Sequence, residues 1–219
     1  IARGCYVSIA YLVGIMTVHH FASSYSAEKE RINAVQRYRA LKANTAVAKA
    51  LIEKQDYYET TLDDSYVLFG NRDAKMRITI LSNPHCNPCA RMHERVDKLL
   101  DSCGYDICVQ YIFSSFNEKL EDISRYLISC YDFADQQSSR ERFTKWYAGE
   151  KNNHENLVKE CSYQIHNDDV EKELSKHKEW RKRSNLVATP TILVNGFELP
   201  DEYEIEDLTM IVDGNFVKQ

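Results

Sequence analysis

The chain has 219 residues, of which 43% are hydrophobic and 28% are charged. This composition is that of an ordinary globular protein, and the length allows one substantial core with an appended segment, so we do not expect extended disorder. The net charge of -5 is mild and spread over both halves of the chain, which argues against the broad basic surface that nucleic-acid binding requires.

The first predicted element is an apolar segment at residues 1–27. Residues 4–27 contain no Asp, Glu, Lys or Arg, and residues 5–18 are mostly apolar, which approaches the length of about 20 residues that a bilayer core requires. We favour the end of a transmembrane helix over two alternatives, an uncleaved signal segment and a buried helix of a soluble protein. Arg3 precedes the run, and by the positive-inside rule this places the remaining chain outside the cytoplasm.

Residues 28–59 are predicted to form a linker of one or two amphipathic helices. Their apolar residues recur at helical spacing among charged residues, and neither proline nor glycine interrupts them. We therefore expect a largely solvated helical connection between the apolar segment and the next domain.

Residues 60–219 show the pattern of a separate α/β domain. Short runs of β-branched and aromatic residues predict strands, and Asn195-Gly196 between the last two is a strong signal for a tight hairpin turn. The predicted strands are residues 66–69, 77–81, 107–113, 191–194 and 197–199.

The helices of this domain are predicted from apolar residues at helical spacing. One helix begins at a pair of cysteines and ends near Gly104, so that strand, helix and strand form a βαβ unit with a right-handed crossover. Residues 117–185 are charged, rich in tyrosine and helical in pattern, and we expect them to be an insertion that interrupts the sheet. A last helix is predicted at residues 205–212.

The cysteine pair at the start of the first helix carries the clearest chemistry. Cys86 and Cys89 are separated by Asn87 and Pro88, a spacing that closes a small disulfide, and the unpaired N–H groups of the helix start favour the thiolate of Cys86. Because the thiolate is the attacking species, Cys86 is the expected nucleophile and Cys89 the cysteine that resolves the mixed disulfide. His85 is a candidate for substrate binding, with the alternative that it merely ends the preceding loop.

A second feature is Thr189-Pro190, directly before a predicted strand. Proline cannot donate a hydrogen bond to a sheet, so it is expected at a strand start or an edge. Only about 5% of X-Pro bonds are cis, so physics alone does not predict that isomer here.

These features resemble the thioredoxin superfamily, and its DsbA-like branch in particular, over residues 60–219. The motifs that carry the resemblance are Phe69-Gly70-Asn71, Asp73-Ala74, Cys86 with Cys89, the helical insertion, and Thr189-Pro190. The resemblance implies a thioredoxin fold, with a central mixed sheet flanked by helices, and thiol-disulfide exchange that needs no cofactor. It also implies a cis proline at 190 that lies against the cysteine pair, with substrate binding at Thr189 and Pro190.

A narrower resemblance is to the thioredoxin domain fused behind bacterial vitamin K epoxide reductase homologues. It rests on residues 83–93 and 195–200, followed by Tyr203 and residues 205–208. It implies a membrane partner of the vitamin K epoxide reductase type, which reoxidises the domain and passes electrons to quinone. The apolar start then corresponds to the end of a membrane span, and the reductase cysteines would lie upstream or be absent.

Two departures from the family pattern matter. Ile80 stands six residues before Cys86, where thioredoxins and DsbA relatives usually have a buried acid, so proton transfer at Cys89 needs water or another group. The dipeptide Asn87-Pro88 lacks the histidine that makes DsbA strongly oxidising, so these residues do not fix the direction of electron flow.

The seven cysteines are many for a cytosolic protein, and an oxidising compartment fits them better. Besides the active pair, we favour structural disulfides over unpaired buried thiols, with Cys5 left over. The expected pairs are Cys103 with Cys108 and Cys130 with Cys161.

A zinc-binding structural module is the alternative from a different class of function. The first two cysteine pairs have the spacing of a four-thiolate zinc site, with His85 or His93 as further ligands. However, at about 1.5 Å per residue the pairs lie about 20 Å apart along the helix, which argues against a zinc site. We therefore expect no metal.

The sequence as a whole predicts a thiol-disulfide oxidoreductase of protein substrates in the periplasm or another extracytoplasmic space. Oxidation is the favoured direction, with reduction or isomerisation as the alternative.

Overall fold

The computed structural model describes residues 2–115, 117, 120–149 and 165–212, and the chain divides into two units, Ile1–Asn44 and Thr45–Gln219. The first unit is one helix, α1 (Ala2–Lys42), which runs through the predicted border between residues 27 and 28. Large apolar side chains such as Phe21 and Tyr25 are exposed on it. Within the described part of the chain, no helix combines the length and the apolar character needed to cross a membrane.

The second unit is built on a mixed sheet with the strand order β1-β3-β2-β4-β5. Strands β2 and β3 run parallel at its centre, and the other neighbouring pairs are antiparallel. The strands are β1 (Leu68–Gly70), β2 (Met76–Ser82), β3 (Ile107–Phe113), β4 (Thr191–Val194) and β5 (Phe197–Glu198). This arrangement confirms the predicted thioredoxin fold.

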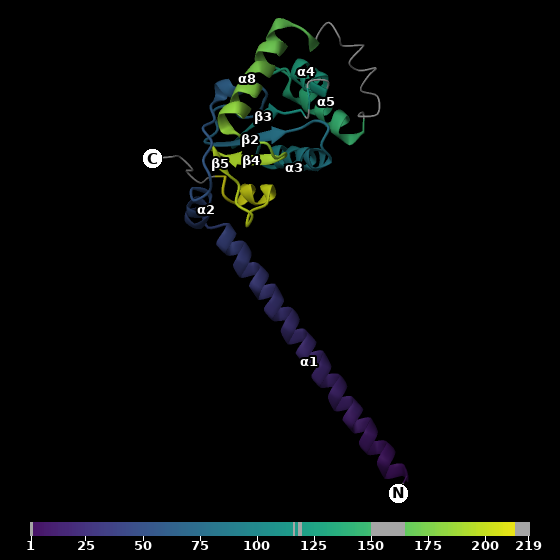
Figure 1. Cartoon of the computed structure of the whole chain (residues 1–219). Helices are drawn as coiled ribbons and strands as arrows, with labels where there is room; N and C mark the ends of the chain where they lie inside the picture. Colours follow the sequence, from purple (N-terminus) through teal and green to yellow (C-terminus); the bar gives the residue numbers. More distant parts are fainter. Residues whose placement is uncertain (1, 116, 118–119, 150–164, 213–219) are drawn as a thin grey trace. The chain divides into compact units, whose positions relative to one another are not determined.

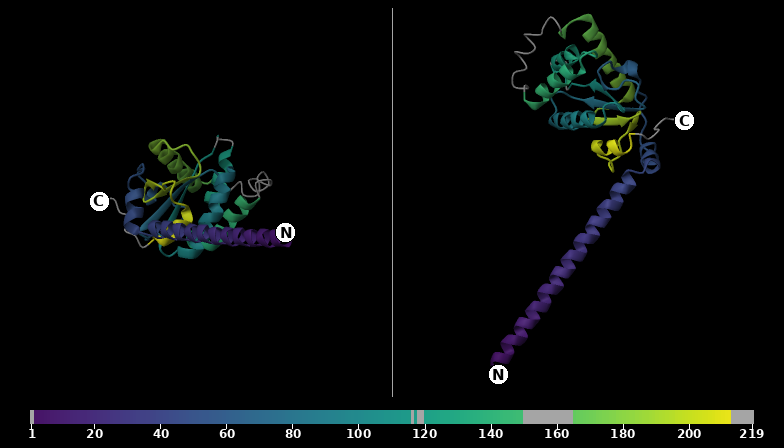
Figure 2. Two further views of the ribbon diagram at one scale, coloured as in Figure 1. Left: turned by 90° about the horizontal axis from the view of Figure 1, so that it is seen from below. Right: turned by 180° about the vertical axis from the view of Figure 1, so that it is seen from behind.

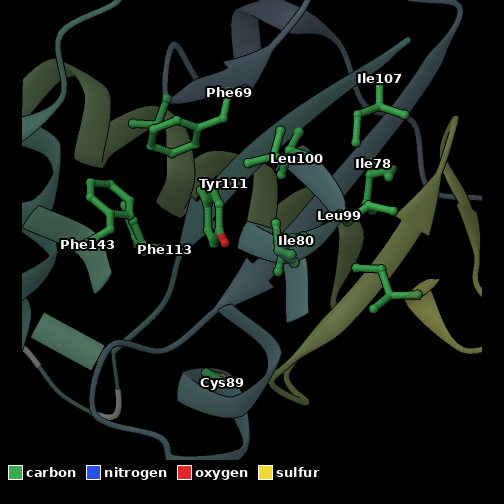
Figure 3. Close-up of a cluster of buried hydrophobic side chains, with 14 of the residues drawn as sticks. Phe69, Ile78, Ile80, Cys89, Leu99, Leu100, Ile107, Tyr111, Phe113 and Phe143 are labelled. Atoms are coloured by element: carbon green, nitrogen blue, oxygen red, sulfur yellow. The ribbon is translucent and has the colours of Figure 1, made fainter. Parts of the chain in front are cut away.

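Helices cover both faces of the sheet, which explains why nearly every residue of β2 and β3 is buried. Helix α3 (Asn87–Cys103) lies on one face and α8 (Asp168–Ser184) on the other, as Figure 1 and the view from behind in Figure 2 show. The main core lies on the α3 side, where Ile78, Ile80 and Tyr111 meet aromatic side chains that include Phe143 (Figure 3). A smaller cluster on the α8 side contains Leu81, Ile112, Trp180 and Leu193.

The described parts of the linker and of the insertion each contain more than one helix. Helix α2 (Thr45–Ile52) follows α1, and its Ala48 and Ile52 are fully buried in the main core, so this part of the linker is not solvated. The described helices of the insertion are α4 (Glu121–Cys130), α5 (Gln136–Ala148) and α8. Cys161 lies outside the described residues, and so does its predicted disulfide with Cys130.

The end of the domain differs from the prediction in helix type. The predicted helix at 205–212 is the 3-10 helix η4 (Ile205–Met210), and another short 3-10 helix, η1 (Leu62–Asp64), precedes β1. Ile205, Leu208 and Ile211 are all buried, and their spacing of three residues is the period of a 3-10 helix. The predicted Asn195-Gly196 turn is present, with positive φ at both residues, 49° and 90°.

Candidate active site

Cys86 lies at the N-terminal end of α3. It is the N-cap residue, with extended backbone angles, and the helix begins at Asn87. Pro88 fits the first turn because a backbone N–H there has no partner within the helix. The unpaired N–H groups and the positive end of the helix are therefore beside the Cys86 sulfur.

The sheet brings Thr189 and Pro190 to the same place. β4 pairs with β2 so that Thr191 lies opposite Leu81, and β2 leads directly into the cysteine loop. The Thr189–Pro190 peptide bond is cis, the isomer that the family resemblance implies. Sγ of Cys86, which is half-buried, lies 3.7 Å from the carbonyl oxygen of Thr189.

Cys89 lies deeper than Cys86. Its side chain is 1% exposed and belongs to the main core cluster, and Figure 3 shows it on the first turn of α3. The backbone N–H of Asn83 donates to Cys89 Sγ at 3.3 Å. Burial raises the pKa of the Cys89 thiol, and the Asn83 N–H opposes this effect because it stabilises the thiolate. Only one cysteine of the pair is thus accessible to a reaction partner.

The helical insertion supports the cysteine loop. The indole N–H of Trp146, a fully buried residue of α5, donates to the carbonyl of Pro84 at 3.0 Å. The His85 ring packs edge-on against Trp146, with centroids 6.0 Å apart, and its Nε2 lies 3.3 Å from the carbonyl oxygen of Leu120. His85 is therefore at the border of the loop with the insertion, half-buried rather than extended into solvent.

A polar groove is lined in part by the cis proline, Pro190. It has a volume of about 280 Å³, and Glu198, Asp201 and Glu204 are among its lining residues together with Pro190. The guanidinium of Arg95 on α3 donates to Glu204 at 2.5 Å and to Glu206 at 2.5 Å, which joins η4 to the helix that carries the cysteines.

The structure also contains buried polar residues near the cysteines, and of these the sequence pattern indicated only His93, as a ligand of the alternative zinc site. Ser82 Oγ and Tyr147 Oη lie 3.0 Å apart, and His93 Nδ1 lies 2.9 Å from Tyr111 Oη. His93 follows Cys89 by four residues, and on a helix this spacing predicts that the two side chains lie on the same face. No comparable signal distinguished Tyr147 from the other tyrosines of the insertion.

The remaining predicted cysteine pair is not joined in this structure. Sγ of Cys103 lies 3.4 Å from the carbonyl of Leu99 in its own helix, and Cys108 is buried within β3, where burial raises the pKa of its thiol to about 11. Strand pairing explains this placement, since Cys108 lies opposite Gly70 and Arg77 in the sheet. Among the described residues, no three His, Cys, Asp or Glu side chains converge on a metal position, so the cysteines of the zinc alternative are not brought together.

The comparisons with known proteins agree with this architecture. A family model with the description Thioredoxin (Thioredoxin_4) matches residues 61–214. No curated protein sequence matches the chain.

Several solved structures are similar in fold. Oxidised BdbD from Bacillus subtilis is 12% identical and has a TM-score of 0.54, with 73% of this chain and 96% of BdbD covered. A thioredoxin-like oxidoreductase from Silicibacter pomeroyi DSS-3 is 16% identical with a TM-score of 0.55, and the match covers 70% and 96%. DsbA from Chlamydia trachomatis is 16% identical with a TM-score of 0.52, and the match covers 70% and 92%.

Proposed function

The chain belongs to the thioredoxin family, and on this basis we propose that it is a thiol-disulfide oxidoreductase that acts on protein substrates through Cys86 and Cys89. One observation carries the proposal: an accessible cysteine at a helix N-terminus lies 3.7 Å from the carbonyl before a cis proline, and a buried cysteine follows one turn later. This arrangement gives the two thiols different tasks, since only Cys86 can meet a protein substrate.

The proposed cycle begins with the Cys86–Cys89 disulfide. A substrate thiolate attacks Sγ of Cys86, the bond to Cys89 breaks, and Cys89 leaves as a thiolate that takes up a proton. A second substrate thiolate then attacks the substrate sulfur of the mixed disulfide and releases Cys86 as a thiolate. Two electrons have passed from the substrate to the cysteine pair, and the helix N-terminus stabilises the charge on Cys86.

Thr189 and Pro190 are proposed to bind the substrate chain. The carbonyl of Thr189 already lies beside Cys86 Sγ, so a substrate segment that pairs with this backbone would present its own sulfur to Cys86. The groove lined by Pro190 would extend this surface. His85 is also proposed to contact the substrate, from its place where the cysteine loop meets the insertion.

The direction of electron flow and the compartment are further parts of the proposal. We place the activity outside the cytoplasm, as an oxidant that a membrane partner of the vitamin K epoxide reductase type reoxidises. The seven cysteines support an oxidising compartment. Attachment to a membrane is proposed from the sequence of residues 4–27 alone, since no described helix is long and apolar enough to span a bilayer. Reduction or isomerisation of substrate disulfides uses the same residues and is the alternative.

Trapping of mixed disulfides tests the proposed roles. With Cys89→Ser, the mixed disulfide on Cys86 cannot be resolved from within the chain, so substrate adducts should accumulate on that variant. With Cys86→Ser, both adducts and exchange should disappear, whereas the matched control Cys103→Ser should behave as the unaltered chain. Full exchange activity in the Cys86→Ser variant would refute the assignment.

A further inference from the structure

Cys89 must gain or lose a proton in each reaction cycle, although its thiol is buried. The side chain is 1% exposed, and Ile80 of β2, equally buried, belongs to the same apolar cluster. Figure 3 shows both residues on the α3 side of the sheet. A proton that leaves or reaches such a thiol needs polar groups within the core, because apolar side chains cannot carry it.

One pair of buried hydroxyls adjoins the loop residue that donates a hydrogen bond to the Cys89 sulfur. Tyr147 Oη on α5 is 3.0 Å from Ser82 Oγ, and both residues are at most 7% exposed. Ser82 directly precedes Asn83, whose backbone N–H donates to Cys89 Sγ. The Tyr147 hydroxyl is therefore hydrogen-bonded to Ser82, the chain neighbour of the residue whose N–H donates to the Cys89 sulfur.

A second pair adjoins the first. Tyr111 lies opposite Ile80 in the register of β2 and β3, and its hydroxyl is 2.9 Å from Nδ1 of His93, one helical turn after Cys89. In Figure 3 the Tyr111 hydroxyl points toward the end of the core where Cys89 lies. The His93 ring stacks on Tyr147, with centroids 4.7 Å apart, so the two pairs form one buried polar cluster. The buried members of this cluster are Ser82, His93, Tyr111 and Tyr147, and Oγ1 of the exposed Thr144 lies 3.3 Å from His93 Nε2.

The cluster interacts electrostatically with Cys89. Burial is the main reason that the pKa values of Tyr111 and Tyr147 are raised, and negative charge on Cys89 raises both further. Burial also lowers the pKa of His93 to about 4, so its ring is neutral near pH 7 and the cluster is a set of neutral hydrogen-bonding groups. Three other titratable groups face the cluster. They are Cys86 at the N-cap of α3, Asp97 on α3, and Arg140 on α5, which donates to Asp97 at 2.7 Å.

Given the proposed function above, we propose that Tyr147 and Tyr111 are positioning residues through which this buried polar cluster controls the gain and loss of the Cys89 proton. During resolution of a mixed disulfide, the Cys89 S–H bond breaks and the proton passes by way of the hydroxyls to solvent. The Cys89–Cys86 bond then forms, the bond from Cys86 to the substrate sulfur breaks, and the substrate leaves as a thiolate that takes a proton from solvent. When a substrate thiolate instead attacks the Cys86–Cys89 disulfide, the same hydroxyls stabilise the Cys89 thiolate as it leaves.

The test separates the two chemical steps in the full chain. Reduced protein is mixed with excess oxidised glutathione at a series of pH values and quenched with acid, and the glutathione adduct and the internal disulfide are separated by mass. Formation of the adduct reports on Cys86, and its conversion to the internal disulfide reports on Cys89. Tyr147→Phe and Tyr111→Phe each remove one oxygen atom and keep the ring.

In both variants we expect the second step to be about tenfold slower near neutral pH, because loss of the hydroxyl raises the pKa of Cys89 further, while the first step is unchanged. Tyr131→Phe is the matched control, since it removes another partly buried hydroxyl that donates to the carbonyl of Leu68. It should leave both steps unchanged.

An unchanged second step and pH profile in both variants would overturn the inference. If Tyr147→Phe does not fold, Ser82→Ala removes the same hydrogen bond from the other side and is judged by the same criterion. Failure of the proposed function gives a different result, because the unaltered chain would then form no adduct at Cys86.

Discussion

The buried imidazole of His93 makes the stability of the fold depend on pH. Burial lowers its pKa from 6.5 to about 4 in the folded chain, so between these values the unfolded chain binds a proton that the folded chain does not. Stability is therefore fully present above the unfolded value and is lost as the pH falls toward 4. At about 1.4 kcal/mol for each tenfold change in proton affinity, the complete loss is about 3 kcal/mol, of which about 2 kcal/mol falls between about pH 7 and pH 5.

Urea unfolding, followed by tryptophan fluorescence, measures this contribution. His93→Gln keeps a polar side chain of similar size but cannot titrate, so the variant should lose about 2 kcal/mol less than the unaltered chain between about pH 7 and pH 5. His20→Gln on α1 is the matched control, because His20 is exposed, and it should keep the original dependence. If His93→Gln and the unaltered chain show the same change in unfolding free energy over this range, the reasoning is refuted.

Two further substitutions test the packing of the domain, one at the hairpin between β4 and β5 and one beneath the cysteine loop. Gly196→Ala should destabilise the fold by about 2 kcal/mol in urea unfolding, because φ is +90° there and an added Cβ would lie 2.8 Å from the carbonyl oxygen of Tyr58; an unchanged midpoint would contradict this. Trp146→Phe should cost about 2 kcal/mol, since it leaves a small cavity and removes the donor to the buried carbonyl of Pro84. A change below about 0.5 kcal/mol would show that the insertion does not support the cysteine loop.

Local patterns in the sequence were sufficient for the strands, the βαβ unit and the cysteine pair. The runs at 107–113 and 191–194 coincide with β3 and β4 because β-branched and aromatic residues between turn signals have few other stable arrangements. The cysteines could be placed on α3 because the order of strand, cysteine pair, proline and amphipathic helix is visible within about 25 residues.

Contacts between distant segments could not be predicted in the same way. Ser82 and Tyr147 are 65 residues apart, and their hydrogen bond depends on how α5 packs against α3. Cys103 and Cys108 are close in sequence, but one lies at the end of a helix and the other in a buried strand, and they are unpaired in this structure. The 3-10 helix at Ile205–Met210 has apolar residues three apart, a spacing that also occurs in α-helices.

The reduction potential of the Cys86–Cys89 pair tests the central claim most directly. The full chain is equilibrated with glutathione buffers, and the thiols at these two positions are counted by alkylation and mass analysis. We predict one reversible two-electron transition that Cys86→Ser abolishes, with a potential nearer to the value of about -120 mV for DsbA than to about -270 mV for thioredoxin. A value near the thioredoxin end would indicate a reductant, and a pair that takes up and releases no electrons at any glutathione ratio would contradict the account.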